Sequence, residues 1–430
     1  MTDASRSFLL ESPERLERLR RVIATALAGN DFYAGRLRDA GLDASVESLA
    51  AFTDRMPFTT KDDLVADQRT APPYGTNLSY PPNRYTRLHQ TSATSGRRPL
   101  RWLDTAEDWD WMCDGWVEVL RAAGVTPDDR MLVAFSFGPF IGLWLGFDAG
   151  TRLGCLTIPG GAMDSATRLK VLLEHRATVL CCTPTYALRL GEVARTEGID
   201  LSTCDVRAIV VGGEPGASVP GTRERMKDLW PTAHLFDHYG MTEIGPATYQ
   251  CPQCPGAVHV LDSLLCEIID PETGAALPTG DDRPGELVMT TLGRAGSPVL
   301  RYRTGDLARA LPIERCACGR TTLQLAGGVI GRADDMVVIR GVNLYPSVVD
   351  EIVRSVEGVS EYRVEIDTRP ALADVLVTVE ADETLADPDA VCSGVQAAFR
   401  DTYSLRIRAT AVAAGTLPRF ELKARRWIKQ

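Results

Sequence analysis

Hydrophobic and polar positions change their spacing along the chain, and these changes predict distinct segments. After Ser12 and Pro13, apolar residues recur every three or four positions from Leu16 to Leu27, which predicts an N-terminal helix. From about residue 100, short apolar runs alternate with amphipathic stretches. The predicted strands are Arg130–Phe137, Val179–Thr183 and Ala208–Val211, and the predicted helices are Ala166–Leu173 and Ala187–Thr196. This alternation predicts βαβ units and a sheet with parallel strands.

The pattern becomes richer in short strands after about residue 255. The predicted strands there are Val258–Leu261, Cys266–Ile269, Glu286–Thr290 and Val299–Tyr302, separated by Gly, Pro and Asp. They predict a β-rich part over 255–330, with a distorted barrel as one arrangement. A mixed pattern returns after Gly331-Arg332, with predicted elements at Met336–Ile339, Val348–Val356 and Asp374–Val379. We therefore predict an α/β protein with a large N-terminal domain, 1–332, of mixed and parallel sheets layered with helices, and a small α+β C-terminal domain, 333–430.

Composition and charge narrow the function classes. The chain has 430 residues, of which 44% are hydrophobic and 24% are charged, a balance typical of folded globular proteins rather than disordered ones. The formal net charge of −10 argues against a nucleic-acid-binding surface. The sequence contains no apolar run of about 18 residues, and its first residues lack the basic and apolar parts of a secretion signal. We expect a cytoplasmic protein without nucleic-acid or membrane partners.

Four of the eleven cysteines differ from the others in their surroundings. Cys251 and Cys254 form one closely spaced pair and Cys316 and Cys318 another, both in polar segments that contain Pro or Gly. Paired thiolates are ligands that Zn²⁺ prefers, so the four predict one tetrahedral, structural Zn²⁺ site. His259 is the competing ligand, in place of Cys254. The alternative interpretation is that these are unrelated exposed cysteines.

A hydroxyl-rich segment extends from His89 to Pro99, with the sequence His-Gln-Thr-Ser-Ala-Thr-Ser-Gly-Arg-Arg-Pro. Hydroxyl and backbone N–H groups can donate hydrogen bonds to a polyphosphate, and arginines can balance its charge. The segment lacks the spacing of a P-loop. Taken alone, it is therefore also compatible with an ordinary solvent-exposed loop.

Two further segments contain a glycine and an acid within a few residues of each other. In the segment from Asp237 to Gly245, an aromatic ring could stack on a base while Glu243 holds a phosphate-bound Mg²⁺. In the segment from Arg301 to Leu307, Asp306 follows a glycine turn and could accept both hydroxyls of a ribose. Each segment alone is equally compatible with a turn that has no such function.

Together and in their order, these segments resemble the adenylate-forming superfamily and, within it, the phenylacetate–CoA ligase group. The segments that carry the resemblance are His89–Pro99, the GGEP of 212–215, the HYGMTE of 238–243, the RYRTGDL of 301–307, the GRADDMVVIRGVNLYP of 331–346 and the LPRFELKA of 417–424. The resemblance implies two steps. A carboxylate attacks the α-phosphate of ATP to give an acyl-adenylate and pyrophosphate, and the thiol of coenzyme A then displaces AMP to give a thioester. It also implies a Mg²⁺ requirement and a small C-terminal domain that is mobile between the steps.

The resemblance assigns roles to individual residues. Those implied to bind the nucleotide are Thr91, Ser92, Thr94, Ser95, Gly96, Gly213, Glu214, Pro215, Asp237, His238, Tyr239, Gly240, Met241, Asp306 and Arg332. Thr242 and Glu243 would contact phosphate and Mg²⁺, and Lys423 on the small domain would reach the α-phosphate during adenylation. Because members of the group are often dimers, a homodimer is a further expectation.

Three positions depart from the family pattern. Ala93 and Leu422 stand where the family commonly has Gly, and Arg97 stands where it has Lys. None of these changes removes a required charge, so we expect an active enzyme. Two alternatives remain open: the adenylate could pass to an amine or a carrier-protein thiol, or the fold could bind nucleotide without catalysis.

The acyl group would lie beside a segment rich in aromatic residues. The residues that the resemblance places there are Phe135, Phe137, Phe140, Trp144 and His238. Four aromatic side chains fit a flat aryl or arylacetic acid, although they could equally pack in the core. His238 could accept a hydrogen bond from a ring substituent or could serve only as a capping residue. The expected partners are thus a small carboxylic acid, ATP and coenzyme A.

Overall fold

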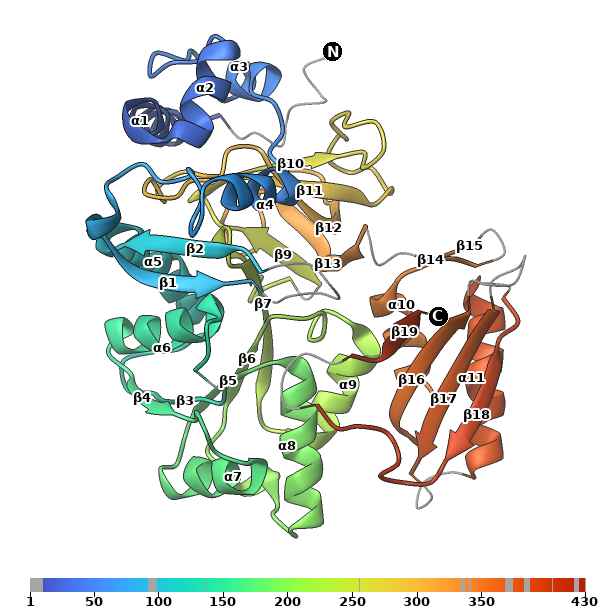
Figure 1. The fold of residues 1–430 in the computed structure, drawn as a ribbon. Coiled ribbons are helices and arrows are strands. Elements are labelled where there is room, and N and C mark those ends of the chain that lie inside the picture. The colour runs from blue at the N-terminus through green and yellow to red at the C-terminus, as the bar shows by residue number, and fades with distance from the viewer. Residues whose placement is uncertain are drawn as a thin grey trace.

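The computed structural model describes residues 11–91, 99–135, 137–254, 256–333, 337–339, 342–367, 374–382, 387–403, 405–420 and 425–429. Within them, a large layered domain is followed by a smaller α+β domain at the C-terminus (Figure 1). This confirms the predicted α/β class. The described residues include no helix whose length and apolar character would allow it to cross a membrane.

The centre of the large domain is one sheet, in which eleven described strands have the order β10-β11-β12-β13-β9-β8-β7-β6-β5-β3-β4. The strands with parallel pairing are β3 (Arg130–Val133), β4 (Leu156–Pro159), β5 (Val179–Cys182), β6 (Ala208–Val211) and β7 (His234–Met241). The antiparallel strands are β8 (Gly245–Gln250), β9 (Ala257–Val260), β10 (Leu264–Ile269), β11 (Gly285–Thr291), β12 (Tyr302–Ala310) and β13 (Gln324–Arg332). Strand β7 is parallel to β6 and antiparallel to β8, so it joins the two halves.

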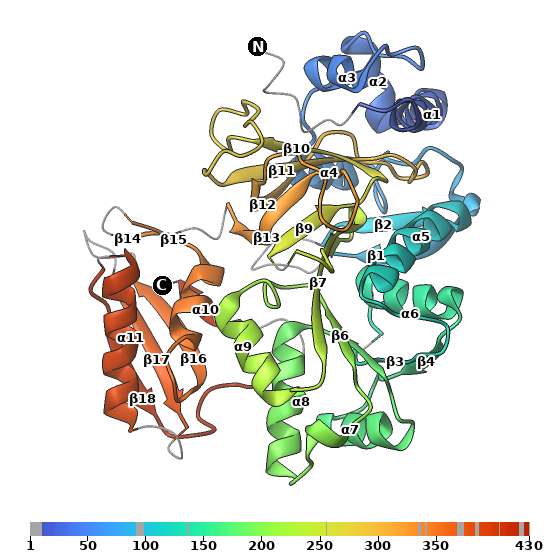
Figure 2. The ribbon, with the colours of Figure 1, turned by 180° about the vertical axis from the view of Figure 1, so that it is seen from behind.

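Alternate side chains of the parallel strands enter two different hydrophobic cores. Leu132, Leu180 and Ile209 pack with α7 (Ser165–Glu174), α8 (Pro184–Thr196) and α9 (Pro220–Leu229). Val133 and Val210 instead pack with α5 (Ala106–Ala122) and α6 (Ile141–Leu153). Because helices cover both faces, the central strands β5 and β6 are continuous apolar runs rather than alternating ones. Figures 1 and 2 show the two helical layers on either side of the sheet.

Three sequence-based expectations need correction. Strand β3 ends at Val133 rather than Phe137, close to the level at which its neighbour β4 also ends. The segment Val299–Tyr302 is not a strand, because Arg301 has a φ of +46° and β12 starts only at Tyr302. The β-rich part does not close into a separate barrel, since β8 to β13 continue the central sheet.

Helices and a hairpin cover the antiparallel half of the sheet. The helices are α1 (Pro13–Gly29), α2 (Asp31–Asp39), α3 (Leu49–Arg55) and α4 (Lys61–Thr70), and the hairpin strands are β1 (Tyr85–Gln90) and β2 (Arg101–Thr105). The side chain of Ser12 accepts a hydrogen bond from the N–H of Arg15, which confirms the predicted start of α1. The guanidinium of Arg15 also donates to the carbonyl of Leu264 at 2.6 Å and so ties α1 to β10.

The C-terminal domain has its own sheet, with the strand order β18-β17-β16-β19, and its own hydrophobic core. Its elements are β14 (Val337–Ile339), β15 (Val342–Leu344), α10 (Pro346–Arg354), β16 (Val359–Asp367), β17 (Asp374–Ala381), α11 (Pro388–Tyr403), β18 (Arg408–Val412) and β19 (Trp427–Lys429). Helix α10 packs beside α9 of the large domain (Figure 2). The Thr222 hydroxyl of α9 donates to the Asp350 carboxylate of α10 at 2.5 Å.

Candidate active site

The C-terminal end of β7 presents side chains to both faces of the sheet, because side chains alternate along a strand. Asp237 and Tyr239 share one face, and His238 points to the other. The Asp237 carboxylate accepts a hydrogen bond from the backbone N–H of Ser218 at 2.9 Å and another from its hydroxyl. Burial raises the pKa of Asp237 to about 7. The junction strand thus brings an acid and a phenol to one side and an imidazole to the other.

Tyr239, Asp306 and Arg332 meet although they come from three strands. The Tyr239 hydroxyl donates to one oxygen of Asp306 at 2.6 Å, and the guanidinium of Arg332 lies 3.3 Å from the other oxygen. Asp306 and Arg332 are direct partners in the β12–β13 register. Gly305 has a φ of +75°, and a Cβ there would lie 2.8 Å from the Arg332 guanidinium. The structure therefore brings together three residues that the sequence analysis had placed at the nucleotide.

Glu243 is a buried carboxylate next to this group. It is 2% exposed, and its Oε1 accepts a hydrogen bond from the Tyr302 hydroxyl at 3.1 Å. Within the described ranges, no cationic side chain pairs with Glu243. The neighbouring Thr242 carbonyl accepts from Arg294 at 2.7 Å, and Arg294 is held by both oxygens of Asp104. A buried carboxylate without a protein cation can hold a metal cation.

The segment from Gly212 to Pro215 follows β6. Gly213 has a φ of +92°, and a Cβ on Gly212 would lie 2.7 Å from the His238 carbonyl oxygen, so both positions favour glycine. Glu214 Oε1 accepts a hydrogen bond from the backbone N–H of Thr185 at 2.9 Å, in the first turn of α8. The positive end of the helix dipole suits a carboxylate at that place. This contact holds the segment against α8, beside the end of β7.

Only the two edges of the hydroxyl-rich segment, His89–Thr91 and Pro99, are described. Thr91 is mostly buried, its N–H donates to the Leu100 carbonyl, and its hydroxyl accepts from the Leu100 N–H, each at 3.0 Å. These bonds close the base of the β1–β2 connection. The predicted site residues that lie outside the described ranges are Ser92, Thr94, Ser95, Gly96 and Lys423, together with the departing positions Ala93, Arg97 and Leu422.

The predicted acyl-site aromatic residues have different surroundings. Phe135 is buried in the core under α5 and α6. The Phe137 ring lies 4.9 Å from the Trp144 ring in an edge-on arrangement, and the Trp144 indole N–H donates to the Gly138 carbonyl at 2.9 Å. Phe140 precedes the first residue of α6. These contacts include core packing, which was one of the two expected outcomes.

His238 contacts a tryptophan that the sequence analysis did not single out. Its ring centroid lies 4.3 Å from that of Trp116 on α5. Its Nδ1 lies 2.8 Å from the Thr248 carbonyl oxygen on β8. Burial lowers the pKa of His238 to about 4. Trp116 belongs to an apolar stripe with Trp109 and Met112, which from sequence indicates only a buried helix face.

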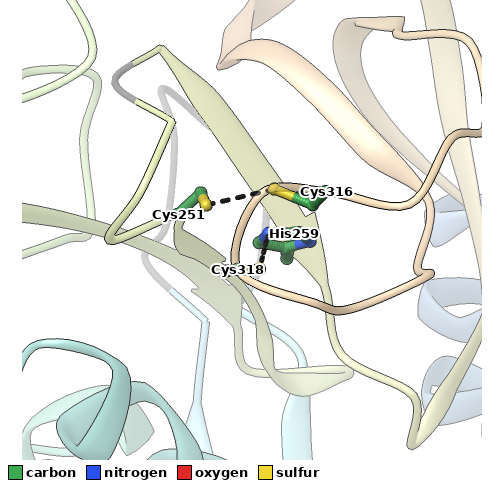
Figure 3. Close-up of side chains that lie close together, drawn as sticks. All are labelled: Cys251, His259, Cys316 and Cys318. Carbon is green, nitrogen blue, oxygen red and sulfur yellow. Dashed lines mark hydrogen bonds between the residues drawn. The ribbon is translucent and has the colours of Figure 1, made fainter.

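The predicted metal-binding residues gather between β8, β9 and the β12–β13 connection (Figure 3). We use the name cysteine–histidine cluster for Cys251, His259, Cys316 and Cys318, whose ligand atoms all lie within 4.8 Å of one another. The Cys251 and Cys316 sulfurs are 3.4 Å apart, and the Cys318 sulfur is 3.3 Å from His259 Nε2. The Cys254 sulfur is also 3.4 Å from Cys316, so both competing ligands stay close. These donor types fit Zn²⁺.

Comparisons with known proteins agree with this arrangement. Residues 110–294 match the family model of the AMP-binding enzyme, and residues 341–430 match that of the AMP-binding enzyme C-terminal domain. The phenylacetate-coenzyme A ligase of Thermus thermophilus is 32% identical over 372 residues, which cover 85% of this chain and 80% of that protein. The phenylacetate-coenzyme A ligase of Escherichia coli is 32% identical over 95% of this chain and 92% of its own length.

Solved structures of 2-hydroxyisobutyryl-CoA ligase, 29% identical, match this chain in more than one state. The match to the postadenylation state, in complex with R3-HIB-AMP, has a TM-score of 0.91 and covers 99% of this chain and 91% of that one. The match to the thioesterification state, with 2-HIB-AMP and CoA, has a TM-score of 0.71 and covers 100% and 90%. From these family models and relatives, the chain belongs to the adenylate-forming superfamily of AMP-binding enzymes.

Proposed function

We propose that the protein is an AMP-forming acid–CoA ligase. It joins a carboxylic acid to the α-phosphate of ATP, releases pyrophosphate and then transfers the acyl group to the thiol of coenzyme A. The observation that carries the proposal is the meeting of Tyr239 and Arg332 on the carboxylate of Asp306. Relatives that are named phenylacetate-coenzyme A ligases, at 32% identity, support this reaction and an aryl or arylacetic acid as its substrate.

Nucleotide binding would use side chains from both halves of the central sheet, which meet at β7. The Asp306 carboxylate would accept hydrogen bonds from the ribose hydroxyls, and Arg332 would contact a further ribose or phosphate oxygen. Tyr239 would stack near the adenine, whose pocket Glu214 and Pro215 would line. The remaining proposed nucleotide contacts are Thr91, Ser92, Thr94, Ser95, Gly96, Gly213, Asp237, Gly240 and Met241. The ribose hydroxyls would compete with the Tyr239 hydroxyl for Asp306, so nucleotide binding would replace one hydrogen bond with others.

The chemical step needs positive charge at the developing phosphate oxyanion more than it needs an acid or a base. A bound Mg²⁺ would supply part of this charge, and Glu243, a buried carboxylate with no cationic partner among the described residues, would hold it together with Thr242. Lys423 would supply the other part at the α-phosphate. Because Lys423 lies on the small domain, its charge can be present for adenylation and withdrawn for the thiol step.

The orientation of the small domain supports this sequence of events. The whole chain matches the postadenylation state of 2-hydroxyisobutyryl-CoA ligase better than its thioesterification state. The small domain would therefore face the large one more as in the postadenylation state than as in the thioesterification state. We place the boundary between the two domains at residue 332, the last residue of β13 and of the central sheet.

The cysteine–histidine cluster would hold one structural Zn²⁺. Cys251, Cys316 and Cys318 offer sulfur, and His259 offers Nε2 while its Nδ1 is held at 2.7 Å from the Thr322 hydroxyl. Such an outer partner fixes the orientation of a ligating imidazole. Cys254 remains the alternative fourth ligand to His259. Four protein ligands would leave no open position, so the metal would stabilise the sheet and take no part in the reaction.

The test is pyrophosphate release with ATP and Mg²⁺ over benzoic, arylacetic, cinnamic and aliphatic acids, with and without coenzyme A. We expect release with an aryl acid and thioester formation when coenzyme A is present. Release without a thioester would point to an amine or a carrier-protein thiol as the acceptor. ATP binding without release for any acid would support a non-catalytic nucleotide-binding protein instead.

A further inference from the structure

The imidazole of His238 occupies a distinct place between two parts of the site. It projects from β7 on the face opposite to Tyr239, the residue that contacts Asp306. On that face its ring lies against Trp116, and the aromatic side chains of α5 and α6 form the surrounding core. His238 thus stands one residue from the nucleotide group and on the side where the acyl group is proposed to bind.

The hydrogen bond to β8 determines which ring nitrogen carries the proton. A carbonyl oxygen can only accept, so Nδ1, 2.8 Å from the Thr248 carbonyl, must be the donor. Burial lowers the pKa of His238 to about 4, so the ring is neutral near pH 7. A neutral imidazole with its proton on Nδ1 has a lone pair on Nε2. His238 therefore presents a hydrogen-bond acceptor at this nitrogen.

That acceptor has no donor in the described part of the chain. The hydrogen bond of His238 there is the one from Nδ1 to Thr248, and its other close ring contact is with Trp116, which is apolar on its face. His238 is 7% exposed, and its Nε2 is left open to a water molecule or a bound ligand. Gly212 lies next to this edge, since a Cβ there would come within 3.2 Å of His238 Cδ2, the carbon bonded to Nε2. A side chain at position 212 would therefore crowd this edge of the ring.

We infer that the acid substrate carries a hydroxyl or amino group that donates a hydrogen bond to Nε2 of His238, while Trp116 packs against its ring. The inference rests on the proposed ligase function and narrows its substrate class to hydroxy- or amino-substituted aryl acids. The donor should be uncharged, because His238 is neutral and is surrounded by apolar side chains that would not balance an ammonium charge. A site built around a buried acceptor rejects the analogue that lacks the donor far more strongly than a purely apolar pocket rejects a change in size.

The experiment compares matched acids in the pyrophosphate-release assay. Benzoic and phenylacetic acids are each measured beside their 2-, 3- and 4-hydroxy and amino derivatives. We expect at least one substituted acid to exceed its parent by about 100-fold or more in kcat/KM, in line with discrimination at hydrogen-bonding sites. The hydroxy and amino arms separate the two donor types. If the unsubstituted parent acids have a kcat/KM equal to that of every derivative, the inference is overturned while the ligase function stands.

Variants at His238 link the preference to this nitrogen. In His238→Leu we expect the ratio of kcat/KM for the substituted acid to kcat/KM for its parent to fall below about tenfold, even if turnover of both acids changes. His238→Gln offers an amide oxygen as acceptor and should restore part of the preference, which a merely structural role would not predict. The matched control is His175→Gln, at an exposed position after α7. An unchanged preference in both folded His238 variants would contradict the inference.

The outcome stays decisive if no acid is turned over. Calorimetric binding of the same acids to the full chain with a non-hydrolysable ATP analogue then replaces the rate measurement. Tighter binding of a substituted acid that is lost in His238→Leu would support the inference even though the ligase function had failed. Equal or absent binding of all the acids would overturn it.

Discussion

Two regions of this molecule connect distant segments in opposite ways. The cysteine–histidine cluster joins β8 and β9 to the β12–β13 connection, with four ligand atoms within 4.8 Å. All of these segments belong to the large domain and have no need to move relative to one another. The contact between the large and small domains uses separate polar pairs instead. The comparison indicates that close side-chain clusters lie within a domain, where the segments keep their relative positions. Weaker, separate pairs lie between the domains, whose relative positions must change.

The interdomain pairs centre on two carboxylates of the small domain. Asp350 accepts hydrogen bonds from Thr222 of the large domain and from Tyr362 of its own domain, both at 2.5 Å. Glu380 accepts from Arg419 at 2.6 Å, and Arg419 in turn lies 3.8 Å from Glu192 of α8. Each carboxylate therefore keeps a partner within the small domain when the domains separate. Such an arrangement avoids leaving a buried charge unpaired after the movement.

Lys423→Ala is expected to have the largest effect, because Lys423 is the proposed reason for the small domain to close. Adenylation should fall by at least about 100-fold, the scale for loss of a positioned group at a developing oxyanion. Thioester formation from supplied acyl-adenylate should change by less than about threefold. The measurement is the two half-reactions, assayed separately. Equal losses in both would contradict a role confined to the closed orientation.

Cys316→Ser should disrupt the cysteine–histidine cluster and therefore lower the stability of the whole large domain. Loss of this proposed metal ligand should lower the free energy of unfolding by several kcal/mol, which corresponds to a fall in Tm of about 5–10 °C for a domain of this size. Elemental analysis should find about one zinc per chain in the parent protein and much less in the variant. Both half-reactions should decline together at temperatures near the new Tm.

Cys392→Ser on α11 is the matched control for that substitution. Cys392 is half-buried in the small domain, outside the cysteine–histidine cluster. It should leave the zinc content unchanged and lower Tm by at most about 2 °C. If the parent protein, purified in the absence of chelators, contained no zinc, the proposal that the cysteine–histidine cluster holds a metal would be wrong.

Glu192→Gln should have the smallest effect and the most selective one. The Glu192–Arg419 pair is 3.8 Å long and partly exposed, with 25% of each side chain accessible. Pairs of this kind contribute about 0.2–1 kcal/mol, so adenylation should slow by about fivefold or less. Tm and thioester formation from supplied adenylate should not change.

The control for this variant is Glu224→Gln on α9. Glu224 pairs with Lys227 on the exposed surface of the same helix, so it has a similar charge without an interdomain contact. Neither half-reaction should respond to it. If Glu192→Gln lowered both half-reactions equally, Glu192 would stabilise the large domain and not its contact with the small one.

Some elements of the fold could be predicted because their determinants are local. Ser12 and Pro13 begin α1 as expected, and the apolar runs at Val179 and Ala208 become β5 and β6. Val299–Tyr302 misled the prediction because its composition is strand-like, yet Arg301 adopts a positive φ. The side chain of Arg301 contacts both oxygens of Glu267, at 2.7 and 2.8 Å, on another strand. Such a partner cannot be found from neighbours in sequence.

The candidate site likewise has features that could be predicted from the sequence and features that could not. The amino-acid sequence by itself determined the order of the segments proposed to bind the nucleotide and the spacing of the cysteine pairs, because both depend on residue types close together in the chain. Only the tertiary structure decided that His259 lies within the cysteine cluster, that Trp116 faces His238, and that the Thr248 carbonyl leaves Nε2 as the acceptor. These are contacts between segments brought together by packing and strand register, and no local pattern encodes them.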